Sequence, residues 1–79
     1  MLTVYAVQSF DEVEGCLVIG TRVQARSADG ALRRAEGLNT FKTGAIAMQI
    51  LTDDKSGKVE GVTVLGTFGS VPAEFVPLA

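Results

Sequence analysis

The first ten residues contain the feature that most constrains the fold, because apolar side chains alternate onto both faces of an expected strand. One face would carry Thr3, Tyr5 and Val7, and the other Leu2, Val4 and Ala6. A strand that is apolar on both faces needs cover on both sides, which is typical of a strand inside a sheet. We therefore expect residues 2–9 to form a central strand with a neighbour at each edge.

The next segment, residues 11–15, is polar and ends in Gly15, which indicates a turn. Alternation resumes over residues 16–26, where one face is predicted to hold the apolar side chains of Leu17, Ile19, Val23 and Ala25. The opposite face ends in Arg22, Gln24 and Arg26. Because charged side chains protect an exposed sheet edge against unwanted pairing, we expect this second strand to lie at the edge.

A short amphipathic helix is predicted after the second strand. Ser27 is a typical N-cap, and Asp29 falls in the first turn, where the helix dipole favours negative charge. At about 100° per residue, one arc of this helix collects the apolar side chains of Ala28, Ala31, Leu32, Ala35 and Leu38. Asn39 is expected to end the helix in a left-handed conformation.

Two further β-rich runs, residues 45–52 and 59–68, are separated by a polar segment with a late glycine, which predicts a hairpin. In the first run one face would carry Ile46, Met48 and Ile50, and in the second one face would carry Val62, Val64 and Phe68.

These elements predict an α+β protein, with one small ββαββ domain over residues 1–70 and a C-terminal tail over residues 71–79. If the first strand lies between the second and the third, the four-stranded, mainly antiparallel sheet has the order 2-1-3-4. The single helix then packs on one face of the sheet.

A helix of this length covers only part of such a sheet. Four strands at about 4.8 Å spacing, with about nine residues at 3.3 Å each, give a face near 19 by 30 Å. A helix of about eleven residues is only about 17 Å long and 10 Å wide. The remaining apolar cover in the chain comes from the tail residues Phe75, Val76 and Leu78. Either the tail folds back onto the sheet or a second chain covers it, and the second alternative predicts a homodimer.

Composition narrows the functional classes. The 79 residues include one cysteine, Cys16, and no histidine, so an internal disulfide is excluded and the commonest metal ligand and general base is missing. No apolar run is long enough to span a membrane, and the N-terminal residues do not resemble a secretory signal, so we expect a cytoplasmic protein without membrane contact. We expect no cofactor and no metal. The sequence favours a non-enzymatic role without excluding carboxylate or tyrosine chemistry.

Three short motifs resemble functional signatures but lack residues that the chemistry requires. Residues 42–44 match the K-T-G box of penicillin-binding enzymes, yet no serine in the chain has a lysine three residues later. Residues 55–58 resemble part of a phosphate loop, but Val59 stands where a hydroxyl would hold magnesium. Asp53 and Asp54 lack the acidic ladder of an EF-hand. We interpret all three segments as strand entries and turns.

One cluster of charge is a candidate interaction patch, and its members are Arg22, Arg26, Arg33 and Arg34. Such a cluster could bind phosphate or an acidic partner, or it could be a solvated edge and helix face. The net charge of -2 and the pI near 4.9 are unlike those of typical nucleic-acid-binding domains, so we expect no nucleic-acid partner.

The segment Gly15-Cys16-Leu17-Val18, followed by a strand and then by Ser27, Ala31, Leu32 and Ala35 on a helix, resembles the strand-strand-helix opening of HicB-type antitoxins. This resemblance covers about half the chain and implies a partner-binding role. The chain departs from the pattern at Ala25-Arg26, where such proteins carry a proline-glycine turn, so no residue role is carried over.

The sequence thus favours a protein-interaction module that acts as a homodimer. The alternative is a small-ligand-binding or regulatory, antitoxin-like domain with a pocket between helix and sheet.

Overall fold

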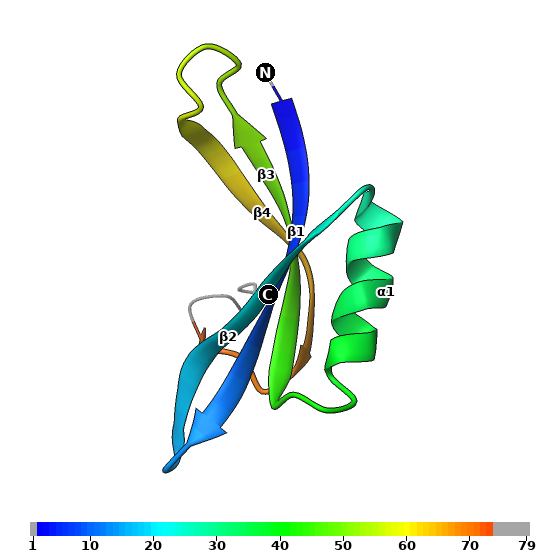
Figure 1. The fold of residues 1–79 in the computed structure, drawn as a ribbon, viewed down its shortest axis with the longest axis vertical. Helices are drawn as coiled ribbons and strands as arrows, with labels where there is room; N and C mark the ends of the chain where they lie inside the picture. Colours follow the sequence, from blue (N-terminus) through cyan, green and yellow to red (C-terminus); the bar gives the residue numbers. More distant parts are fainter. Residues whose placement is uncertain (1, 74–79) are drawn as a thin grey trace.

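The computed structural model describes residues 2–73, which form four strands and one helix in the order ββαββ (Figure 1). The elements are β1 (Leu2–Val13), β2 (Cys16–Ala25), α1 (Ala28–Leu38), β3 (Gly44–Thr52) and β4 (Val59–Gly69). The sheet order is β2-β1-β3-β4, and every neighbouring pair is antiparallel. The predicted α+β class, the strand order and the central position of β1 are confirmed.

The turn between β1 and β2 is shorter than the sequence predicts. Residues 11–13 belong to β1 and pair with β2, and Val13 lies opposite Cys16. Only Glu14 and Gly15 are left to form the turn, with φ angles of 52° and 81°. Positive φ at both central residues is typical of the tight turns that match the twist of a hairpin. The prediction of a turn over residues 11–15 is therefore wrong at its first three positions.

A bulge in β2 changes which of its side chains share a face. Gln8 pairs with Arg22 and Phe10 with Ile19, so Gly20 and Thr21 together lie opposite a single residue of β1. The extra residue shifts the alternation by one position. The predicted common face is therefore wrong: Ala25 packs on the helix side of the sheet, and Leu17 packs on the opposite side.

A second bulge has the same effect in β4. Val64 pairs with Met48 and Gly66 pairs with Ala47, which leaves Leu65 as the extra residue. The prediction that Val62, Val64 and Phe68 share a face is therefore wrong at Phe68. The Phe68 side chain packs on the helix side of the sheet.

The helix begins as predicted and ends differently. The Ser27 hydroxyl accepts a hydrogen bond from the backbone N–H of Gly30, as an N-cap does. Asn39 has right-handed angles, with φ -63° and ψ -17°, so the predicted left-handed cap is wrong. No left-handed residue is required here, because the N–H groups of residues 40–42 bond to the carbonyls of Gly37 and Leu38 and close the last turn.

Two apolar clusters lie on the two faces of the sheet. On the helix side, α1 contributes Ala31 and Ala35, which are fully buried against Val7, Ala45 and Ala47. Alanines on both elements let the helix approach the strands closely. On the other side, which we call the helix-free face, the buried residues are Ala6, Phe10, Ile46 and Met48.

Val71 helps to close the helix-free face after the chain leaves β4. It packs against the cluster around Ile46, together with Leu17 and Ile50. The segment that follows β4 passes very close to the start of β3, because a Cβ on Gly44 would collide with the backbone of Ser70. The tail residues Phe75, Val76 and Leu78, for which we predicted a covering role, lie outside the described residues.

Candidate functional site

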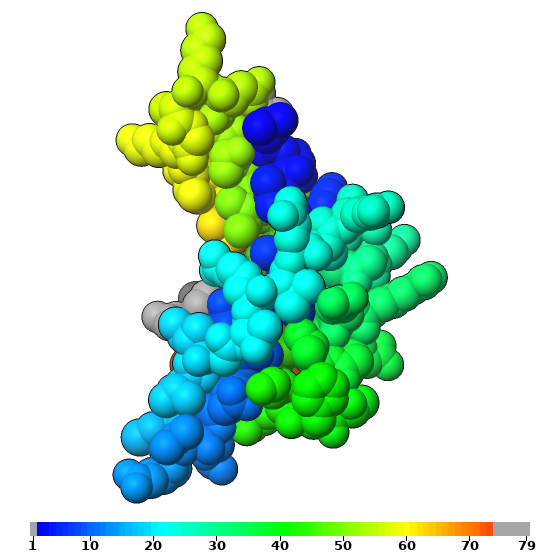
Figure 2. All heavy atoms as spheres, in the orientation of Figure 1, coloured from blue at the N-terminus to red at the C-terminus, as the bar shows by residue number. Residues whose placement is uncertain are grey.

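The helix covers the middle of the sheet, and in Figure 1 the β1–β2 hairpin extends beyond it at the bottom of the view. In Figure 1, β3 and β4 run past α1 to a hairpin at the top of the view, beside the start of β1. Figure 2 shows this hairpin end as a projection from the body of the molecule. Apolar side chains at this end therefore have little of the described chain to pack against.

Six of these side chains lie on the helix-free face, and we call them the outer apolar patch. The strand register places them together, since Val4 pairs with Ile50 and Ile50 pairs with Val62. Leu2 and Val59 both pair with Thr52, and Val64 pairs with Met48. The patch consists of Leu2, Val4, Ile50, Val59, Val62 and Val64.

Exposure distinguishes this patch from the closed cluster around Phe10 and Ile46 on the same face. Leu2, Val59 and Val62 expose 56%, 55% and 54% of their surface, and the other three members are half-buried. Phe10 and Ile46, farther along the same face, expose 2% or less. On this face the exposed apolar side chains of β1 and β4 therefore lie at the hairpin end, and Ile19 on β2 is exposed separately at the other end of the sheet.

Sequence reasoning identified an uncovered apolar face but not its extent. It placed Val62 and Val64 with Phe68 on one face and did not include Val59. Val59 reaches the patch because a further register shift lies between Leu51 and Thr52 in the pairing with β4. No local signal in the sequence marks that shift.

The four candidate arginines do not form one surface. Arg26 and Arg34 line one open cleft of about 340 Å³ where β2 leads into α1, together with Gln24, Ala25, Ser27 and Gly30. Arg22 pairs with Gln8 and so lies on the helix-free face. Arg33 is exposed on α1 but does not line the cleft.

None of the four arginine side chains has an ion-pair or hydrogen-bond partner within residues 2–73. In the cleft, two guanidinium groups therefore keep their donors available, next to the start of a helix. Arginine donors in this arrangement suit carboxylate or phosphate groups.

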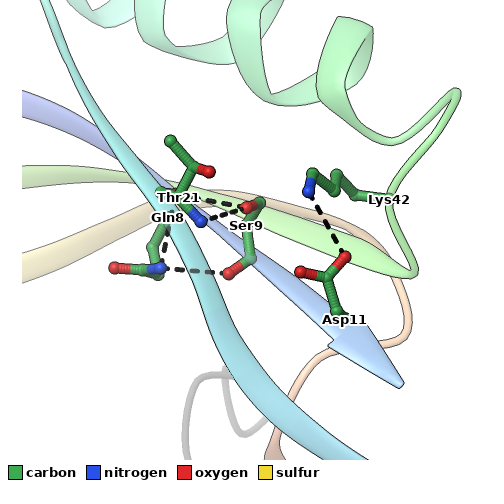
Figure 3. Close-up of polar contacts among 5 residues, drawn as sticks. All are labelled: Gln8, Ser9, Asp11, Thr21 and Lys42. Atoms are coloured by element: carbon green, nitrogen blue, oxygen red, sulfur yellow. Dashed lines mark hydrogen bonds and ion pairs between the residues drawn. The ribbon is translucent and has the colours of Figure 1, made fainter. Parts of the chain in front are cut away.

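A network of polar groups lies between β1 and β2, and its hydrogen bonds are made at the bulge in β2 (Figure 3). The Ser9 hydroxyl accepts a hydrogen bond from the Thr21 N–H at 2.8 Å and donates to the Thr21 carbonyl at 3.2 Å. The Gln8 side-chain amide donates to the carbonyls of Ser9 and Thr21. Beside this network, Lys42 Nζ lies 3.5 Å from Asp11 Oδ1. Ser9 is fully buried, and its hydrogen bonds to Thr21 hold β1 and β2 together at the bulge.

Other polar groups provide weaker candidates. A cleft of about 310 Å³ at the β3–β4 hairpin is lined by Asp53, Asp54, Lys55 and Glu60. Within residues 2–73, no group of three or more cysteine, aspartate or glutamate side chains is arranged to hold a metal ion. Cys16 is exposed at the start of β2.

Comparison with known proteins adds no functional information. No protein family model, curated protein or solved structure matches the chain. In the described part of the chain, no helix has the length and apolar character needed to cross a membrane.

Proposed function

We propose that the chain is a non-enzymatic protein-interaction module that acts as a homodimer through the outer apolar patch. The observation that carries this proposal is the exposure of Leu2, Val59 and Val62 on one open sheet face, where Leu2 and Val59 flank Thr52. Contiguous apolar surface rimmed by polar residues is typical of interaction sites. A non-enzymatic role is supported by the lack of histidine and by the structural use of the buried polar groups.

Light scattering of the purified chain at micromolar to millimolar concentration tests the proposal. We expect a mass approaching twice 8.3 kDa as the concentration rises. Val62→Lys should return the mass to that of one chain, because burying an unpaired charge in an apolar contact has a large desolvation penalty.

Thr63→Lys is the matched control. Thr63 is the exposed neighbour of Val62 in β4, and its partner Gln49 places it on the helix side of the sheet. This variant should dimerise like the original chain. A single-chain mass for the original protein over the whole concentration range would refute the proposed function.

A second candidate function is the binding of a small acidic ligand in the cleft beside Arg26 and Arg34. It is favoured by the two guanidinium groups, which have no partner within residues 2–73. This second candidate corresponds to the alternative of a small-ligand-binding or regulatory domain that the sequence leaves open. A cytoplasmic location and the lack of a nucleic-acid partner stay predictions.

A further inference from the structure

We draw no further inference here: the strongest candidate, the outer edge of β4, has no strand partner within residues 2–73 but is interrupted by two register shifts, and nothing in the structure shows what covers it.

Discussion

A single side chain, Ser9, determines how β1 and β2 fit together. Its hydroxyl bonds to both the N–H and the carbonyl of Thr21, and these are groups that a bulge removes from the regular ladder. Gly20 is required beside it, because a Cβ at that position would lie 2.6 Å from Ser9 Oγ and 2.9 Å from Asp11 Oδ2. The small polar residue and the glycine together allow the bulge to form in a buried place.

We predict that Ser9→Ala lowers the free energy of unfolding by about 1 kcal/mol, because the Thr21 N–H loses its partner at a partly buried site. In a domain of this size such a loss lowers Tm by roughly 5 °C or more. Thermal unfolding followed by circular dichroism measures the change.

Ser70→Ala is the control, since Ser70 is exposed and its hydroxyl has no partner within residues 2–73. It should change stability by less than about 0.5 kcal/mol. Equal stability of the two variants would show that the Ser9 hydroxyl does not hold the bulge.

Among the elements, the junction of β2 and α1 creates the arginine cleft. Arg26 follows the end of β2, and Arg34 projects from the second turn of α1, so neither element alone contains the cleft. The N-cap bond of Ser27 sets the direction of the helix start between them. The spacing of the arginines in the sequence gives no indication that Arg26 lies with Arg34 and apart from Arg22.

If the cleft binds acidic ligands, the double variant Arg26→Glu and Arg34→Glu should abolish binding of inorganic pyrophosphate, measured by calorimetry. Tm should stay nearly unchanged, because exposed charges contribute less than about 1 kcal/mol to stability. Binding to the original chain should also weaken with added salt.

The double variant Arg22→Glu and Arg33→Glu provides the control, since it makes the same change in charge at two arginines that do not line the cleft. It should bind pyrophosphate almost as well as the original chain. No measurable binding to the original chain, or equal loss in both variants, would contradict a specific site in the cleft.

For the protein as a whole, the main consequence of the fold is that one helix covers a four-stranded sheet incompletely. The helix-side core is built from small residues, and its buried members are Val7, Ala31, Ala35, Ala45 and Ala47. A chain of this size buries only about 60% of the surface that its unfolded form exposes. Association of two chains would add apolar burial that the single chain lacks.

We therefore predict that stability depends on protein concentration. A hundredfold rise in concentration favours a dimer over two unfolded chains by about 2.7 kcal/mol, so Tm should rise by roughly 5 °C or more over that range. Scanning calorimetry of the original chain and of Val62→Lys measures the effect, and Tm of the variant should stay constant. A constant Tm for both proteins would contradict dimer formation in this range.

The sequence alone predicts the elements and their order, because those depend on local patterns. Alternating apolar residues in β1 indicate a central strand, and Ser27 with the apolar arc around Ala31 and Ala35 indicates a capped helix. These signals come from neighbours within a few positions along the chain, and side-chain periodicity reflects them directly.

The faces of the edge strands were decided only in the tertiary structure. Each bulge arises from the pairing of two strands: Gly20 and Thr21 lie opposite Ser9, and Leu65 is the extra residue beside Ala47. One extra residue moves every later side chain to the other face. Leu17 and Ala25 therefore lie on opposite faces of the sheet, and so do Phe68 and Val62. The outer apolar patch depends on pairing between segments that are distant in the sequence, and the arginine cleft depends on how β2 leads into α1. Local periodicity determines neither the extent of the patch nor the grouping of the arginines.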